Sequence, residues 1–567
     1  MVAQEKTSEV IPLRDPAVVM RLARLGSFHQ SRLSFMRILT RRMTEEKWTF
    51  SRPEFDIDAQ GVGHAVYCAH TPHRTYSLVA FAHDLPEDQR SDRVIAEAWD
   101  STFTLFDGVP DADDIARLRQ NIPLQEAGRV TQKELSVSRA NRSVRLWEHV
   151  VSHLARGAQP DAAQIAKVGY LMRTTAVYGS GKLGAADREM IADRAEFAAP
   201  FQVEMLSVFL TRAFVRDLAQ HMANLRGGDR AVALDADIAR SMGIGNSTGL
   251  GMAPFLLNHP KLINNWVLAR ETAIARVRAV PVATPEEVAM FRDLLTRSAI
   301  SADIWHSDHP IQVEKLAILR SDLKRLQAHI ETADLALGTP WDRLFHWANA
   351  ELGTDAQECL TSLMLEPYGR LVDDLAEEMS DIGGVHFRID GSMAVGRLRA
   401  ILERVYGWAL AIDWDDPEKC ARAWYVSEEK LEPRLGQRFE EPIAPYEQPL
   451  APGRDAAALH AALCEWDTEG SVASFLLAHP EHRHSVRRVQ IVDEAPFAEV
   501  QDNTIGSDLL PIDMLRCKLS FFGATHFDPR SDRWVRISLF GNAPYPEELQ
   551  TIGRDDWPYP ALEGGQI

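Results

Sequence analysis

Hydrogen-bond donors gather around glycines in segment 173–184, which reads RTTAVYGSGKLG. The segment combines a guanidinium, three hydroxyls, a phenol and an ammonium with three glycines. Because glycine lets backbone amides approach a ligand closely, this composition suits binding of a phosphate or a carboxylate. We expect Arg173 and Lys182 to bind charge and Tyr178 to transfer protons. The hydroxyls expected to orient the ligand here belong to Thr174, Thr175 and Ser180.

A second segment with the same character is 243–251, which reads GIGNSTGLG and is followed by an apolar run. We expect its polar side chains to complete one anion site shared with segment 173–184, and we consider His259 as an alternative proton-transfer group. The side chains concerned are Asn246, Ser247 and Thr248. A structural role stays open, in which the glycines permit close packing and tight turns while Arg173 and Lys182 are solvated.

The two segments also carry a resemblance. Tyr178 and Lys182 form the Y-x-x-x-K pair, and from Gly245 the sequence is similar to the G-x-x-x-G-L-G cofactor loop of short-chain dehydrogenases. The resemblance implies that Gly245, Gly249 and Gly251 would bind NAD(P). In this chain the catalytic pair precedes the glycines, which reverses the order of that family.

Two further clusters suggest metal ligands, and in both a simpler role is favoured. The DDLAE run at 373–377 has carboxylates on one helical face, but neighbouring acids indicate a solvated acidic surface. Four histidines near Cys68 crowd segment 63–83 without the fixed spacing of a metal site. We therefore predict no metal site.

Composition excludes several classes of protein. The 567 residues are 45% hydrophobic and 25% charged, which is typical of a globular chain. A net charge of −19 disfavours nucleic acids and anionic membranes as partners. The five scattered cysteines disfavour a disulfide scaffold, and no secretory leader or membrane span is evident. We expect a soluble, cytoplasmic homo-oligomer that binds a small anionic molecule.

The elements that must position these residues are predicted to be mainly helical. Apolar residues recur every three to four positions over 15–42, which indicates helix. Alternation over 63–70 and 74–81 indicates a β-hairpin. A capped helix is expected over 91–106, and helical patterns dominate from there to about residue 430.

Proline marks the predicted division into domains. Five prolines between residues 432 and 453 indicate an extended connector. The fold class is therefore mainly α (α+β): a large helical body with a small β-hairpin near 63–83 and a smaller α+β carboxyl-terminal unit. The predicted units are residues 1–90, the helical body 91–431, the connector 432–453 and the α+β unit 454–567, with strands over 515–522 and 534–540.

These observations lead to one functional hypothesis and two alternatives. The hypothesis is a metabolic enzyme that acts by acid–base chemistry on a small phosphate- or carboxylate-bearing substrate. One alternative is an NAD(P)-dependent oxidoreductase, and the other is a non-catalytic helical scaffold or regulatory protein.

Overall fold

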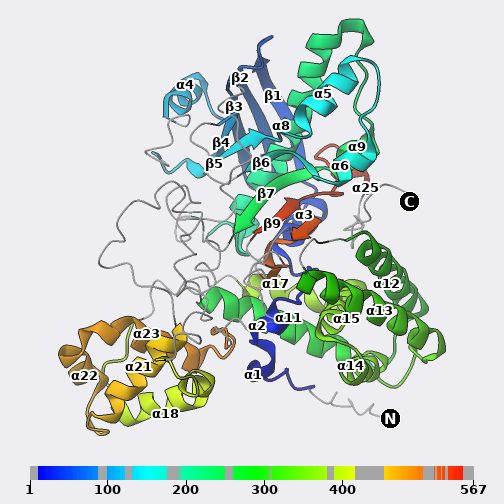
Figure 1. The fold of residues 1–567 in the computed structure, drawn as a ribbon. Helices are drawn as coiled ribbons and strands as arrows, with labels where there is room; N and C mark the ends of the chain where they lie inside the picture. Colours follow the sequence, from blue (N-terminus) through cyan, green and yellow to red (C-terminus); the bar gives the residue numbers. More distant parts are fainter. Residues whose placement is uncertain are drawn as a thin grey trace, which may run out of the picture.

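The chain forms a large β-sheet, a helical body and a smaller helical unit (Figure 1). The computed structural model describes residues 11–86, 99–121, 130–174, 191, 193–249, 260–305, 307, 310–379, 388–415, 452–501, 516–517, 520–524, 526–529 and 534–552.

Within the described residues, the sheet has nine strands in the order β1-β2-β3-β4-β5-β6-β7-β9-β8. All neighbouring strands run antiparallel except the parallel pair β6 and β7. Strands that follow each other in the sequence tend to pair, which explains why β1 to β7 occur in chain order. The strands are β1 (Thr49–Ile57), β2 (Gly63–His70), β3 (Thr75–Ala82), β4 (Ser101–Asp107), β5 (Glu134–Arg142), β6 (Tyr170–Thr174), β7 (Gly243–Gly249), β8 (His526–Pro529) and β9 (Trp534–Leu539).

The inner strands of the sheet bury side chains on both faces, and successive residues of a strand point to opposite faces. On β2, Tyr67 belongs to the large apolar core, while its neighbours Val66 and Cys68 belong to a smaller one. Helix α4 (Ala112–Asn121) completes the smaller core. The 26-residue helix α8 (Gln202–Gly227) contributes most of its length to the large core and packs along the sheet.

The parallel pair β6 and β7 is joined by a helical crossover. The chain leaves β6 at Thr174, passes through α8 and α9 (Ala236–Ser241), and enters β7 at Gly243. Parallel strands need such a connection because the chain must return to its starting edge before the second strand begins. The carboxyl ends of β6 and β7 consequently lie at the same edge of the sheet.

The helical body packs against the short amino-terminal helices, which buried ion pairs hold in place. Arg14 lies 2.6 Å from a carboxylate oxygen of both Glu271 and Glu358. Arg37 binds Glu366 through both of its terminal nitrogens. The helices of this region are α1 (Pro16–Val19), α2 (Leu22–Leu25), α3 (Phe35–Glu45), α11 (Pro260–Arg278), α12 (Pro285–Ile304), α13 (Pro310–Thr332), α14 (Pro340–Glu351), α15 (Thr354–Leu365), η5 (Glu366–Tyr368), α16 (Gly369–Val372) and α17 (Leu375–Glu378).

A smaller helical unit has an apolar core of its own and is seen at the lower left of Figure 1. Leu398 and Leu459 both belong to this core, although they lie on opposite sides of the predicted connector. Only Pro452 and Gly453 of the connector 432–453 are described, so the domain division stays a prediction. The helices here are α18 (Val395–Val405), α19 (Gly407–Leu410), α21 (Pro452–Cys464), α22 (Val472–Ala478), η8 (Pro480–His482) and α23 (Arg483–Glu494).

The remaining helices lie beside the sheet, between its strands in sequence or after the last one. They are α5 (Trp147–Ala155), α6 (Ala162–Ala166), η2 (Ala195–Phe197), η3 (Gly228–Arg230) and α25 (Leu549–Ile552).

The predicted fold class is wrong about the amount of β structure. The hairpin near 63–83 exists as β2 and β3, but it is part of the nine-stranded sheet rather than a small isolated element. The carboxyl-terminal strands β8 and β9 join the same sheet next to β7. Strands that are buried on both faces lose the alternation of apolar and polar residues, so their sequences carry only a weak signal.

The structure agrees with some of the individual helices and strands that the sequence predicts and differs from others. The hairpin and the strand from Trp534 are confirmed. The helix expected over 91–106 is wrong where it is described, because 101–107 is β4. The strand expected over 515–522 is also wrong, since the described residues there are helical.

Candidate functional site

The two glycine-rich segments of the sequence approach each other at one edge of the sheet. Arg173 and Thr174 form the carboxyl end of β6, and Arg173 pairs with Gly245 of the neighbouring strand β7. Since β6 and β7 are parallel, the chain leaves both strands at the same edge. Open α/β sheets bind ligands beyond the carboxyl ends of such parallel strands. A site shared by the two segments requires this arrangement.

Arginines from two strands stand on the same face of the sheet at this edge. Asn141 of β5 pairs with Arg173, and Ala140 pairs with Thr174. Arg139 precedes Asn141 by two positions, so it lies on the same face as Arg173. The Thr174 hydroxyl donates a hydrogen bond of 3.1 Å to the carbonyl of Arg139, which fixes the end of β6 against β5.

The surroundings of Arg139 suit an anion. Its guanidinium lies over the ring of Trp99, with 4.5 Å between the guanidinium carbon and the ring centre. The Nε atom of Arg139 is buried and has no hydrogen-bond partner among the described residues. Burial lowers the pKa of Arg139, yet arginine remains charged at neutral pH. A buried, charged donor without a partner is costly, and an anionic ligand would satisfy it.

Packing explains the first two glycines of β7. A Cβ atom on Gly245 would lie 2.2 Å from the ring of Tyr170, and one on Gly243 would lie 2.2 Å from the carbonyl oxygen of Leu539. Both positions exclude a larger residue whether or not a ligand binds. For Gly245, which we predicted to bind a cofactor, this favours the structural role.

The other predicted site residues are placed only in part. Asn246, Ser247, Thr248 and Gly249 lie in β7, and their side chains are outside the described part of the structure. Six predicted residues lie outside the described residues altogether: Thr175, Tyr178, Ser180, Lys182, Gly251 and His259.

The dehydrogenase-like loop is not seen where it was expected. The resemblance places Gly245 and Gly249 in a loop that follows a strand, whereas both lie within strand β7. Helix α9, not a strand, precedes them. The local sequence match therefore occurs in a different structural context from the one that binds dinucleotides.

The suggested metal ligands bind other partners. Asp373 accepts hydrogen bonds of 2.9 and 2.6 Å from Arg32, and Asp374 accepts from Arg276 at 2.8 Å. His64 lies 3.0 Å from Glu54 and 2.7 Å from Arg119. Among the described residues, no three histidine, cysteine, aspartate or glutamate side chains gather as a metal site would require.

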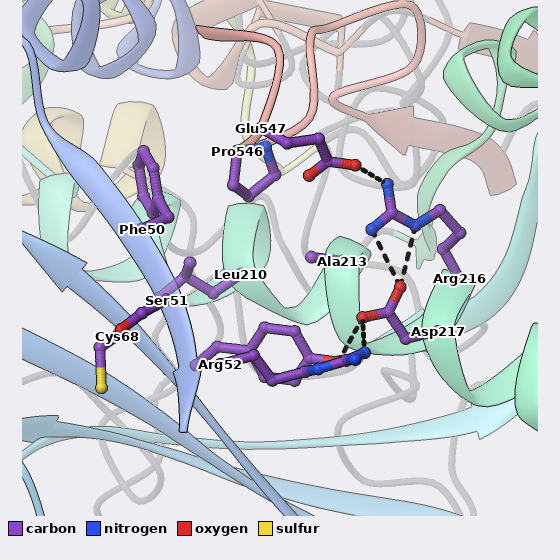
Figure 2. A pocket seen from close by; sticks show the side chains of 11 residues that line it. Phe50, Ser51, Arg52, Cys68, Leu210, Ala213, Arg216, Asp217, Pro546 and Glu547 are labelled. Atoms are coloured by element: carbon purple, nitrogen blue, oxygen red, sulfur yellow. Dashed lines mark hydrogen bonds and ion pairs between the residues drawn. The ribbon is translucent and has the colours of Figure 1, made fainter. Parts of the chain in front are cut away.

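A cleft of about 550 Å³ lies between the first strands and helix α8, and sequence reasoning missed it. One part of the cleft is lined by apolar side chains, and the other part carries two arginines and two carboxylates (Figure 2). Such a combination of apolar surface and a few converging polar groups is typical of small-molecule sites. The lining residues are Phe50, Ser51, Arg52, Tyr67, Cys68, Leu210, Ala213, Arg216, Asp217, Pro546 and Glu547.

Asp217 is the centre of the polar end. Its Oδ2 accepts hydrogen bonds from the Tyr67 hydroxyl at 2.8 Å and from Arg52 at 2.6 Å. Its Oδ1 accepts from two nitrogens of Arg216, at 3.0 and 2.9 Å. A further terminal nitrogen of Arg216 binds the carboxylate of Glu547 (Figure 2). Asp217 thus holds both arginines in fixed positions.

The electrostatics of the cleft favour charge recognition over proton transfer. Burial and the negative charge of Asp217 raise the pKa of Tyr67 far above its ordinary value, so its hydroxyl remains a donor. Burial alone would lower the pKa of Arg216, but Asp217 and Glu547 outweigh it and raise the pKa. The guanidinium groups of Arg216 and Arg212 both lie over the Tyr545 ring.

The sequence contained one signal that could have pointed to this cleft. Arg212, Arg216 and Asp217 lie in or next to the apolar middle part of the helix, and buried charges of this kind need partners. Residues at 213 and 216–217 lie one turn apart on α8 and so face the same way. Their partners on β1 and β2 come from distant parts of the sequence and had no local signature.

No helix within the described ranges is both long enough and apolar enough to cross a membrane. Comparison of the chain with protein-family models, with curated proteins and with solved structures finds no match.

Proposed function

We propose that this protein is an enzyme that acts by acid–base chemistry on a small phosphate- or carboxylate-bearing substrate, bound at the edge where β6 and β7 end. The observation that carries the proposal is the pair Arg139 and Arg173 on one face of this edge, with a buried guanidinium nitrogen of Arg139 unpartnered among the described residues. Lys182 would add a further positive charge, and Tyr178 or His259 would transfer the proton.

The overall charge of −19 is compatible with such a site. Net charge describes the field around the whole molecule, whereas binding depends on the charges within a few ångströms of the ligand. Arg139 and Arg173 place two positively charged side chains at one strand edge. The acidic surface elsewhere would keep nucleic acids and other polyanions away, so small anions are the favoured ligands.

Ligand-induced stabilisation tests the binding part of the proposal. The melting temperature is measured with inorganic phosphate, pyrophosphate or citrate, each against sodium chloride of equal ionic strength. We expect at least one anion to raise the melting temperature by a few degrees, because a ligand at about 100 times its Kd adds about 2.7 kcal/mol. Arg139→Gln and Arg173→Gln should lose this response. Arg297→Gln, which affects a surface pair with Asp293 on α12, is the matched control.

Catalysis is tested separately. Once a stabilising anion has been found, compounds that carry it are screened for turnover, and Lys182→Ala is compared with the wild type. We expect Lys182→Ala to fold normally and to lose activity. A fully active, normally folded variant would show that Lys182 is not part of the site.

A further inference from the structure

The cleft beside α8 is separate from the proposed substrate site. Arg212, one turn before Arg216, donates a hydrogen bond of 2.7 Å to the carbonyl of Met242, which immediately precedes β7. The cleft is lined by residues of β1, β2 and α8 and by the segment at 546–547, whereas Arg139 and Arg173 lie on β5 and at the carboxyl end of β6. A ligand in the cleft would occupy a second site.

Arg216 presents a preformed anion receptor to the cleft. Two of its nitrogens are fixed on Asp217, and another terminal nitrogen binds Glu547. The side chain of Glu547 is 56% exposed, whereas that of Asp217 is 15% exposed. Exposed ion pairs contribute little stability, so Glu547 can leave Arg216 at small cost while Asp217 stays in place.

The polar end of the cleft becomes net positive when Glu547 leaves. Arg52 and Arg216 then carry two positive charges against the single negative charge of Asp217. Asp217 already accepts hydrogen bonds from Tyr67 and from both arginines, so it keeps little capacity for a cation. The remaining positive charge favours binding of an anion. Because Arg216 already binds the carboxylate of Glu547, a carboxylate is the functional group that fits this position.

The apolar wall defines the rest of the ligand. The apolar residues that line the cleft are Phe50 of β1, Leu210 and Ala213 of α8, and Pro546 (Figure 2). A small apolar group in contact with these side chains would be removed from water, which favours binding. A bare inorganic anion would leave this wall unused.

We propose that the cleft binds a small organic carboxylate with an apolar body, whose carboxylate replaces that of Glu547 on Arg216. Glu547 acts as a built-in competitor that covers the receptor when the ligand is absent. The apolar body lies against Leu210, Ala213 and Pro546.

Calorimetric titration of the full-length protein tests this proposal. The probes are 4-phenylbutyrate and 4-phenyl-1-butanol, which share an apolar body and differ in the carboxylate. We expect the carboxylate to bind about tenfold more tightly than the alcohol, since a hydrogen bond to a charged group is worth this factor. Glu547→Gln should tighten binding of 4-phenylbutyrate about two- to fivefold, because it removes the competitor.

Matched variants show whether 4-phenylbutyrate binds in this cleft or elsewhere on the protein. Glu148→Gln removes another largely exposed glutamate, paired with Arg226 of α8, and should leave the affinity unchanged. Arg139→Gln alters the proposed substrate site and should also have no effect. Arg216→Gln should abolish binding; should it fail to fold, Glu547→Gln still decides the question because Glu547 is exposed. Equal affinity of the acid and the alcohol, or no tightening in Glu547→Gln, would overturn the proposal.

Discussion

Two clusters in this protein place arginines around one carboxylate, and they differ in exposure. In the helical body, Glu358 accepts hydrogen bonds from Arg14, Arg24 and Arg270, and its side chain is fully buried. In the cleft, Asp217 is surrounded by Arg52, Arg216 and Tyr67, and the outer carboxylate on Arg216 faces solvent.

The difference shows how exposure separates a structural ion pair from an exchangeable one. Around Glu358 the second acid, Glu271, is also buried, and arginines inside the protein bind both carboxylates. No outside anion can replace these carboxylates without unfolding the region. In the cleft, Glu547 can be replaced by a ligand because water already reaches it. The same residue types therefore stabilise the fold in one place and offer a binding site in the other.

The largest effect is expected for Glu358→Gln. Removal of this charge leaves three arginines partly uncompensated in the interior, which should lower the free energy of unfolding by about 3–5 kcal/mol. Urea denaturation measures the loss. Glu377→Gln is the control, because Glu377 forms an exposed pair with Arg42 and should change stability by less than about 1 kcal/mol. Similar losses in both variants would contradict the distinction.

Asp217→Asn should have an intermediate effect. The side chain is nearly buried and organises three donors, so we expect a loss of about 1–3 kcal/mol in the same denaturation experiment. The variant should also lose binding of 4-phenylbutyrate, since Arg216 is no longer held in position. A loss as large as that of Glu358→Gln would show that the cleft is as structural as the interior.

The pH dependence of the free energy of unfolding provides a further test of the buried groups in the interior. Burial lowers the pKa of His29 to about 4, with the positive charge of Arg516 acting in the same direction. Below pH 6.5 the unfolded chain binds a proton at His29 that the folded protein rejects until about pH 4. The contribution of His29 to the free energy of unfolding is thus fully present above pH 6.5 and is lost as the pH falls toward 4.

We expect the wild type to lose about 1–2 kcal/mol more than His29→Gln between pH 7 and pH 5. Urea denaturation at both pH values measures this difference. Parallel losses in the two proteins would mean that His29 is not the group responsible.

The smallest effect on stability is expected for Glu547→Gln. An exposed ion pair contributes less than about 1 kcal/mol, so the melting curve should hardly change. Its effect should appear in ligand affinity instead. A large loss of stability would show that Glu547 is part of the fold rather than a replaceable competitor.

Local patterns in the sequence predicted only part of the fold. The hairpin of β2 and β3 was predictable because two neighbouring strand-like segments are separated by a short loop around Pro72. Strand β7 was not, since GIGNSTG has the composition of a loop and becomes a strand through pairing with β6 and β9. Such pairing joins residues far apart in the chain and leaves no local signature.

The residues of the candidate sites were likewise predictable only where their signal is local in the sequence. Arg173 was predicted from its glycine-rich neighbourhood, and the structure places it beside Gly245 of the second segment. Arg139 was missed, because only the register of β5 against β6 brings it to the same edge. The cleft was missed because Arg52, Arg216 and Glu547 come from distant parts of the sequence and meet only in the folded protein.

Native mass spectrometry of the purified protein tests the central claim, a small-anion site at the edge of β6 and β7, most directly. The wild type should retain an anionic small molecule, Arg139→Gln and Arg173→Gln should both lose it, and the surface control Arg297→Gln should keep it. Retention of the same molecule by the Arg139 and Arg173 variants, at the wild-type level and in correctly folded protein, would contradict the proposed site.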